Sequence, residues 1–193
     1  MENTEFKVPH LFKTLFVWIS IALIASLLVY QFSKRAVYWQ RHVQNVMRPL
    51  VTSLEPNTRF ELESLFSPVV KSTSHDSLPV LYHFWATWCA PCRAEIPTLD
   101  ALSKKFGSRL KIVAVTVDEN KEDVVRFFGS TVPAFQVLWD KSQLVADQWG
   151  VQKYPETFLM IPGGKTPFKF SGPRDWNSPE AIDYVSRVIG QTS

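Results

Sequence analysis

Two hydrophobic patterns divide this chain. Near its start, the nineteen residues from Thr14 to Phe32 carry no charge and are mostly apolar, which is long enough for a helix to cross the hydrocarbon core of a bilayer. From about residue 57 onward, short apolar runs alternate with stretches in which apolar residues recur every three or four positions. The first pattern predicts a transmembrane helix and the second predicts an α/β domain.

The second region alternates predicted strands and helices. The apolar runs predict strands over residues 79–86, 110–117, 134–139, 156–161 and 167–170, and a weaker alternating stretch over 59–65 suits one more strand. Periodic stretches predict helices over residues 90–106, 121–130, 143–149 and 178–189. Pro97 should bend the first of these helices, and Ser178 with Pro179 supplies an N-cap and a first-turn proline for the last.

These patterns give four parts. We expect a tail over residues 1–13, a membrane anchor over 14–33, a spacer over 34–56 and one domain over 57–193, because 193 residues do not hold two domains of ordinary size. A cleaved signal peptide is the alternative to the anchor. The apolar run is longer than a signal-peptide core and has no small-x-small cleavage site at its end. An uncleaved anchor, with Trp18 and Tyr30 near the two membrane surfaces, is therefore favoured.

The distribution of charge argues against one class of partner. The chain carries 21 Lys and Arg against 18 Asp and Glu, a net charge of +3, and the basic residues are scattered. Nucleic-acid binding usually shows clustered basic residues, so we expect no nucleic-acid partner.

Cys89 and Cys92 are the only cysteines, and they lie where a predicted strand ends and a predicted helix begins. A helix N-terminus favours an anion, so the exposed first sulfur should be partly thiolate and able to attack disulfides. A zinc site is disfavoured because it needs four ligands and the four histidines have no matching spacing. A purely structural bridge would close a two-residue loop and constrain the unfolded chain little.

Two motifs, more than sixty residues apart, carry a family resemblance. The run Trp88-Cys89-Ala90-Pro91-Cys92 with Pro97, and the later run Gly150-Val151-Gln152-Lys153-Tyr154-Pro155-Glu156-Thr157-Phe158-Leu159, resemble the thioredoxin superfamily. Its membrane-anchored TlpA/ResA/DsbE(CcmG)-like thiol-disulfide oxidoreductases are closest, over about residues 57–190. The resemblance implies a thioredoxin-like α/β fold, with a central mixed sheet flanked by helices and a strand–helix insertion between Pro133 and Gly150.

Access predicts the roles of the two cysteines. Cys89, nearest the helix start, should form the mixed disulfide with a partner protein, and Cys92 should attack it and release that partner. The uncharged Ala90-Pro91 pair resembles reducing members of the superfamily, so the reductase direction is favoured. The resemblance implies substrates among exported proteins, with apocytochrome c as a candidate. The redox-active disulfide replaces a cofactor, and an upstream thiol protein must donate electrons because no G-x-G-x-x-G fingerprint occurs.

The resemblance also assigns a substrate site. The residue matching Pro155 has a cis peptide bond in the family and lies beside the cysteines, so the Tyr154–Pro155 bond should be cis and the Tyr154 backbone should pair with a substrate strand. Trp88 would offer an apolar docking surface. Trp85 is expected in the core instead.

Two further residues are candidates for proton transfer. Glu95, one helical turn after Cys92, matches an acidic position of ResA-like proteins, although an exposed acid that favours the helix dipole is the alternative. His83 stands where thioredoxins have a buried aspartate and could exchange a proton with Cys92 or be a hydrogen-bonded core residue. Asp118, Asp140 and Arg174 are interpreted as ends of strands and turns.

Other functions on the same fold stay open. Cys89, Cys92 and His83 could hold copper, since thiolates select Cu(I), and a non-catalytic adaptor is a third class.

The membrane orientation also has two readings. Two basic residues, Lys7 and Lys13, precede the helix, whereas four follow it, Lys34, Arg35, Arg41 and Arg48. This excess of positive charge after the helix would place the domain in the cytoplasm. The resemblance places it on the periplasmic or extracytoplasmic side of the cytoplasmic membrane, behind a single span, and we favour that side.

Overall fold

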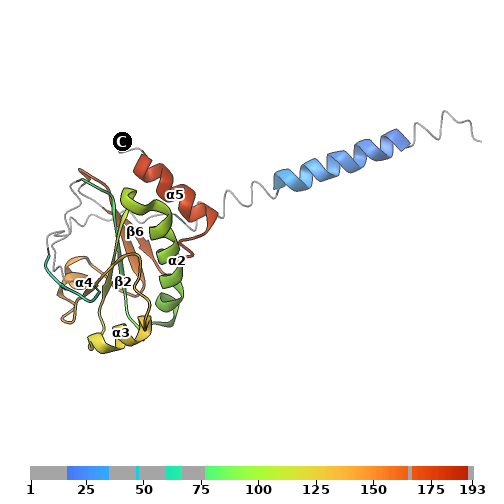
Figure 1. Cartoon of the computed structure of the whole chain (residues 1–193). Coiled ribbons are helices and arrows are strands. Elements are labelled where there is room, and N and C mark those ends of the chain that lie inside the picture. The colour runs from blue at the N-terminus through green and yellow to red at the C-terminus, as the bar shows by residue number, and fades with distance from the viewer. Residues whose placement is uncertain (1–16, 35–46, 48–59, 67–76, 165–166, 191–193) are drawn as a thin grey trace, which may run out of the picture. The chain divides into compact units, whose positions relative to one another are not determined.

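The computed structural model describes residues 17–34, 47, 60–66, 77–164 and 167–190 (Figure 1). The chain forms two compact units, Met1–Val46 and Met47–Ser193. The predicted tail and most of the predicted spacer lie outside the described residues. The four-part division of the chain therefore stays a prediction.

The described part of the first unit is one helix, Val17–Lys34. Its 18 residues have a mean hydropathy of 1.5, and none of them is buried. At 1.5 Å per residue such a helix is roughly 27 Å long, close to the hydrocarbon thickness of a bilayer. The expected apolar helix is thus confirmed from residue 17 onward, and by length and composition it suits a membrane span or a signal sequence.

The second unit is built on one six-stranded mixed sheet, as predicted. Its strands are β1 (Glu63–Ser64), β2 (Val80–Trp85), β3 (Lys111–Thr116), β4 (Gln136–Trp139), β5 (Glu156–Met160) and β6 (Phe168–Ser171). Their order in the sheet is β1-β4-β3-β2-β5-β6. Strands β2, β3 and β4 are parallel, whereas β1, β5 and β6 pair antiparallel with their neighbours.

The helices agree with the predicted periodic stretches. They are α2 (Ala90–Phe106), α3 (Lys121–Phe128), α4 (Leu144–Gln148) and α5 (Pro179–Gly190). Helix α2 has the predicted bounds, and the Ser178 Oγ accepts the Ala181 N–H at 3.2 Å as the expected N-cap of α5. Strand β4 and helix α4 fill the predicted strand–helix insertion.

Most elements are shorter than predicted, and the structure explains two of these differences. The 59–65 stretch forms only a two-residue strand, because β1 pairs with β4 through Glu63 and Ser64 alone. Helix α4 starts one residue late, because Gln143 has a left-handed backbone with φ 57°. Neither difference alters the topology.

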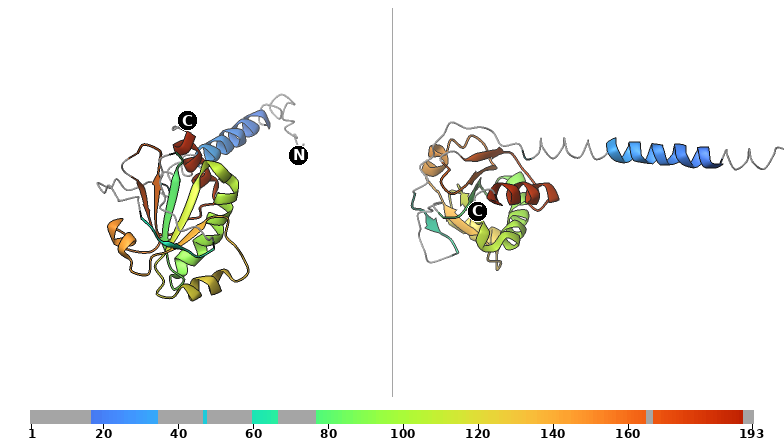
Figure 2. Two further views of the ribbon diagram at one scale, coloured as in Figure 1. Left: turned by 60° about the vertical axis from the view of Figure 1, so that its left-hand side comes forward. Right: turned by 90° about the horizontal axis from the view of Figure 1, so that it is seen from above.

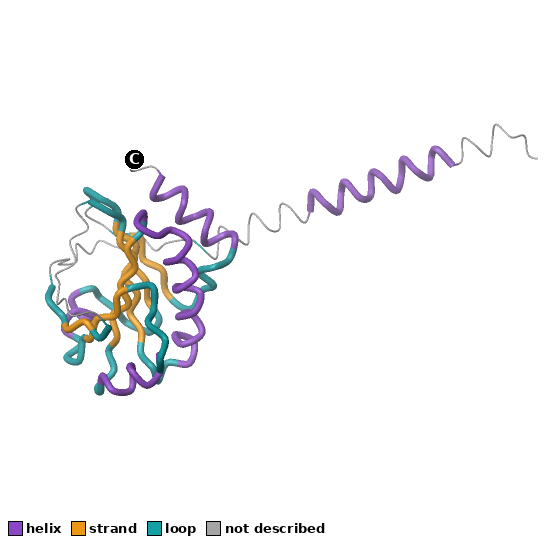
Figure 3. Tube along the Cα trace, viewed as in Figure 1, coloured by secondary structure: helices purple, strands orange, loops and turns teal. Residues whose placement is uncertain are grey.

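The sheet is covered on both faces (Figures 2 and 3). Every residue of β2 is buried, which agrees with its almost entirely apolar sequence, broken only by His83. Trp85 packs against Phe127 and Phe128 of α3 on one face. Tyr82 and Phe84 pack against Trp149, after α4, on the other. The carboxyl end of the central strand β2 therefore lies at one edge of a sheet that is covered on both faces, and the two cysteines follow this end in the sequence.

Candidate redox site

The two cysteines form a disulfide at the start of α2, with their Cα atoms 5.3 Å apart. A tight turn leads from β2 into the helix, because the Cys89 N–H donates to the Ala86 carbonyl at 3.2 Å. Cys89 is the N-cap of α2, and its Sγ accepts the Cys92 N–H at 3.3 Å. The predicted placement at a helix N-terminus is confirmed, and a negative charge on this sulfur would meet a backbone donor.

Access distinguishes the cysteines less sharply than expected. Cys89 was predicted to be exposed, but only 7% of its surface is accessible, while Cys92 is fully buried. The prediction of an exposed sulfur is wrong, since Cys89 is one of the buried residues of the domain. The order of access still holds, and a partner would reach Cys89 first.

The second predicted motif supplies an aromatic surface. The Tyr154–Pro155 peptide bond is cis, as predicted. The Tyr154 ring meets Trp88 edge to face, with centroids 5.7 Å apart, and Trp88 is 64% exposed. Trp85, by contrast, is fully buried, which confirms its expected place in the core. Trp88 and Tyr154 together form an aromatic ledge on the described surface.

Glu95 is buried in the first half of α2, with 2% of its surface accessible. Its Oε1 accepts the Trp176 indole N–H and the Arg174 backbone N–H, both at 2.9 Å. Burial raises the pKa of Glu95 to about 7, although these two hydrogen bonds and the charge of Arg174 favour the ionised form. The expected alternative of an exposed first-turn acid is wrong, and this carboxyl titrates near neutral pH.

Arg174 and Trp176 were not predicted as parts of the site. They belong to the segment between β6 and α5, which lies about 80 residues after Glu95 in the sequence. The Arg174 guanidinium donates to the carbonyls of Ser171 and Gly172, at 3.1 and 2.8 Å, so it orders the segment that presents its own backbone N–H to Glu95. An interpretation of Arg174 as a turn residue was therefore correct but incomplete.

His83 is fully buried in the middle of β2. Its Nδ1 lies 2.9 Å from the Thr157 Oγ1 on the neighbouring strand β5, and burial lowers its pKa to about 3. The ring is thus neutral over the pH range in which thiols ionise. This favours the hydrogen-bonded core residue of the two expected alternatives, while proton exchange with Cys92 stays a prediction.

A buried ion pair lies directly behind the cis proline. Glu156, the residue after Pro155, accepts the Gln152 N–H and lies 2.9 Å from the Lys169 Nζ of β6. Lys169 also donates to the Gly150 carbonyl at 3.0 Å. These contacts hold both ends of the segment from Gly150 to Pro155, which carries Tyr154.

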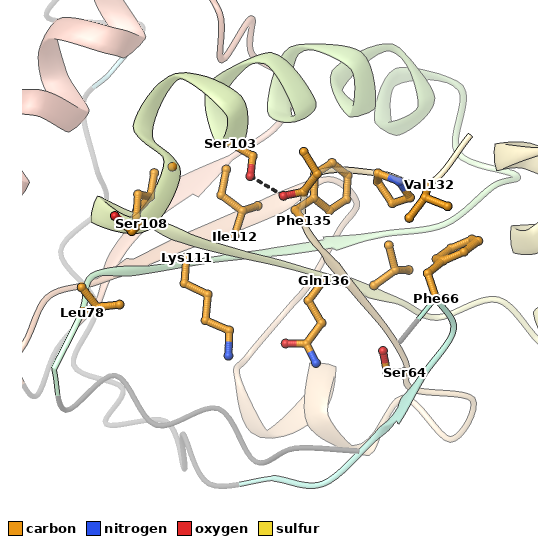
Figure 4. A pocket seen from close by; sticks show the side chains of 15 residues that line it. Ser64, Phe66, Leu78, Ser103, Ser108, Lys111, Ile112, Val132, Phe135 and Gln136 are labelled. Carbon is orange, nitrogen blue, oxygen red and sulfur yellow. Dashed lines mark hydrogen bonds between the residues drawn. The ribbon is translucent and has the colours of Figure 1, made fainter. Parts of the chain in front are cut away.

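The described residues at this end of the sheet do not form a cluster of metal ligands. No three His, Cys, Asp or Glu side chains among the described residues are grouped as a metal ion requires, so the copper hypothesis gains no support there. A groove of about 640 Å³ lies at the opposite edge of the sheet, where Leu78, Lys111 and Gln136 precede or begin the parallel strands (Figure 4). It contains none of the predicted site residues.

The comparisons with known proteins fit this site. The sequence model of the AhpC/TSA family matches residues 56–166, more than half of the chain. The chain belongs to the AhpC/TSA family. The matched span of this family member includes β2, the two cysteines, Glu95 and the cis proline.

Two curated relatives have names that refer to thioredoxin or to thiol-disulfide exchange. The chain is 43% identical over 84 residues to the thioredoxin-like protein YneN of Bacillus subtilis, covering 42% of this chain and 49% of that protein. It is 41% identical over 87 residues to the thiol-disulfide oxidoreductase ResA of the same species, covering 45% and 49%. The aligned regions thus span about half the length of these curated relatives.

Solved structures of thioredoxin-like proteins share the fold of this AhpC/TSA member. A thio-disulfide isomerase from Thermus thermophilus superposes with a TM-score of 0.56 and 26% identity, over 72% of this chain and 98% of that one. A crystal structure from Chlorobium tepidum, assigned to the DsbE thiol:disulfide interchange proteins, gives 0.61 and 25% identity, over 74% and 99%. The predicted thioredoxin-like fold is confirmed.

Proposed function

We propose that this protein is a membrane-anchored thiol-disulfide oxidoreductase that reduces disulfides in exported proteins. The observation that carries the proposal is the Cys89–Cys92 pair at the N-terminus of α2, next to a buried carboxyl whose pKa is about 7. The names of the relatives support the reaction class. The Ala90-Pro91 pair supports the reductase direction.

The reaction proceeds in two exchanges. In the reduced protein, the Cys89 thiolate attacks one sulfur of a partner disulfide, forms a mixed disulfide and releases the other partner sulfur as a thiolate. The Cys92 thiolate then attacks the Cys89 sulfur, which re-forms the Cys89–Cys92 bond and releases the partner's second thiolate. Two electrons thus pass from this protein to the partner. An upstream dithiol protein then supplies two electrons that reduce the Cys89–Cys92 disulfide again.

Glu95 is proposed to handle the proton of the second exchange. Cys92 is fully buried, so its thiol must lose a proton without direct contact with bulk water. A carboxyl with a pKa of about 7 is half ionised near neutral pH, and such a group can accept and release protons with little driving force in either direction. Glu95 lies one helical turn from Cys92, which places it within the same buried layer.

Substrate docking is assigned to the ledge formed by Trp88 and Tyr154. Exposed aromatic side chains of this kind dominate many protein interfaces because they bury large areas at low entropic cost. The backbone of Tyr154 would pair with an extended segment of the partner. Apocytochrome c is one candidate substrate, and the domain would lie on the extracytoplasmic side, where exported proteins acquire disulfides.

The reduction potential of the full chain in detergent tests this proposal. Equilibration with glutathione or dithiothreitol, followed by thiol trapping, should give a value near that of thioredoxin, about −270 mV. A value near −120 mV would reverse the direction to oxidation. If the pair does not cycle at all, the proposal fails, and copper binding or an adaptor role gains weight. In addition, Cys92→Ser should accumulate mixed disulfides through Cys89, whereas Cys89→Ser should not.

A further inference from the structure

Asp118 follows the end of β3 and is buried, with 2% of its surface accessible. Its carboxylate does not form an ion pair with any Lys or Arg in the described part of the chain. Instead, each oxygen accepts hydrogen bonds from threonine. A buried carboxylate is costly unless its oxygens are satisfied, so these bonds must be maintained for Asp118 to remain where it is.

The donors come from the turn before Cys89 and from the end of β3. The Thr87 backbone N–H donates to both carboxylate oxygens, at 3.2 and 3.0 Å, and the Thr87 Oγ1 donates to Oδ1 at 2.5 Å. The Thr116 Oγ1, at the end of β3, donates to Oδ2 at 2.5 Å. We name this set of bonds from Thr87 and Thr116 to Asp118 the carboxylate clamp.

The backbone of Asp118 is itself fixed. The Trp139 indole N–H, from β4, donates to the Asp118 carbonyl at 2.7 Å, and the preceding Val117 N–H donates to the Trp85 carbonyl at 3.1 Å. The clamp is therefore attached to three neighbouring strands. It holds Thr87 against the end of β3.

Thr87 lies between the buried end of β2 and the docking residue Trp88, two positions before Cys89. It is inside the turn that the Cys89 N–H closes on the Ala86 carbonyl. Trp88 is 64% exposed, and its ring contacts that of Tyr154. The conformation of this turn determines where the Cys89 sulfur lies relative to the first turn of α2, and hence relative to Cys92.

We propose that Asp118 is a positioning residue which, through Thr87, keeps Cys89 in register with Cys92 for thiol exchange. The inference rests on the proposed oxidoreductase function and adds a residue that is outside both cysteine motifs. The geometry of the cysteine pair sets the effective concentration of one thiol toward the other. Loosening the turn lowers that effective concentration, while the cysteines themselves remain unchanged.

The test uses Thr87→Val in the full chain, which keeps the shape of the side chain but removes the hydroxyl donor. The equilibrium constant for oxidation of the cysteine pair by glutathione disulfide should fall about tenfold, and the rate of insulin reduction should fall with it, because small misplacements of reacting groups can cost up to about a hundredfold. Thr87→Ser restores the hydroxyl and should recover most of both values.

Ser103→Ala is the matched control. It removes another buried side-chain hydrogen bond, from the Ser103 Oγ to the Ala134 carbonyl at 2.7 Å, at the opposite edge of the sheet (Figure 4). It should lower the unfolding midpoint as Thr87→Val does and leave the glutathione equilibrium unchanged. A double-mutant cycle with Asp118→Ala should be non-additive, since both changes break the same contact.

The outcomes separate the two proposals. A wild-type protein that does not exchange thiols overturns the oxidoreductase function. If the wild type is active but Thr87→Val has the same equilibrium constant with glutathione as Ser103→Ala, only the proposed role of Asp118 is overturned. If Asp118→Ala does not fold, the comparison of Thr87→Val with Thr87→Ser still decides the question.

Discussion

The indole N–H of Trp176 donates to the Glu95 carboxylate at 2.9 Å, although the two residues are 81 positions apart in the sequence. Glu95 lies in the helix that begins at the disulfide, and Trp176 lies in the segment before α5. The contact is fully enclosed, since Trp176 has no accessible surface. The protonation of this carboxyl therefore depends on the correct packing of the segment that precedes α5.

Glu95→Gln should change how stability depends on pH. The pKa of Glu95 is about 7 in the folded protein and about 4.5 in the unfolded chain, so the folded state binds the proton more tightly. The resulting stabilisation is fully present below pH 4.5 and is lost as the pH rises through 7, a change of about 3 kcal/mol by linkage. Urea unfolding at pH 5 and pH 8 would measure it. Equal pH dependence in wild type and variant would contradict the raised pKa.

His83→Asn should reduce the loss of folding stability at low pH, whereas Glu95→Gln affects stability at high pH. The pKa of His83 is lowered from 6.5 to about 3 by burial, so its contribution to stability is present above pH 6.5 and is lost as the pH falls toward 3. The variant cannot gain this proton and should lose less stability on acidification than the wild type. Thermal unfolding at pH 4 and pH 7 tests the difference. A variant that is as acid-sensitive as the wild type would show that another group dominates.

Trp88→Ala should weaken the use of protein substrates selectively. Removing this exposed ring should raise the KM for a protein disulfide about tenfold, the cost expected for an aromatic residue that contributes strongly to an interface. The reaction with glutathione, which does not need the ledge, should be unaffected. Val132→Ala is a suitable control, because Val132 is 70% exposed at the edge of the distant groove. Equal losses with both substrates would mean that Trp88 supports the cysteines and not docking.

Lys169→Met should destabilise the domain by about 3 kcal/mol, because it leaves the Glu156 carboxylate buried without its cation. Both partners are largely enclosed, at 10% and 2% accessibility. Lys104→Met provides the comparison: it breaks the Lys104–Asp100 pair, whose lysine is 68% exposed, and should leave the unfolding free energy unchanged. Chemical unfolding of the two variants side by side measures both effects, and similar losses would disprove the distinction.

The sequence predicted the parts of the fold that local pattern determines. Helix α2 has the expected bounds because its apolar residues recur at helical spacing and Cys89 caps it. The buried strand β2 follows from a run that is apolar except for His83. The cis bond before Pro155 followed from the family resemblance. The predicted length of β1 was too great, since only its pairing with β4 decides where this strand ends.

The partners of the site residues could not be predicted in the same way. Glu95 could be placed one turn after Cys92, but whether it is buried depends on Trp176 and Arg174, which approach through the tertiary fold. Asp118 was correctly placed at the end of a strand, yet its hydrogen bonds to Thr87 depend on the parallel register of β2 and β3. Sequence spacing carries no signal for contacts of this kind.

The order of the chain gives the Glu95 contacts a consequence for synthesis. Cys89, Cys92 and Glu95 leave the ribosome about 80 residues before Arg174 and Trp176, which bind the Glu95 carboxylate. Strand β2 also pairs on one side with β5, which is synthesised later. A growing chain thus has both thiols well before it has the enclosed acid. The surroundings of Glu95, which we propose to transfer protons, are completed only when the segment before α5 packs. A nascent chain, or one truncated before Arg174, would carry both cysteines without these contacts.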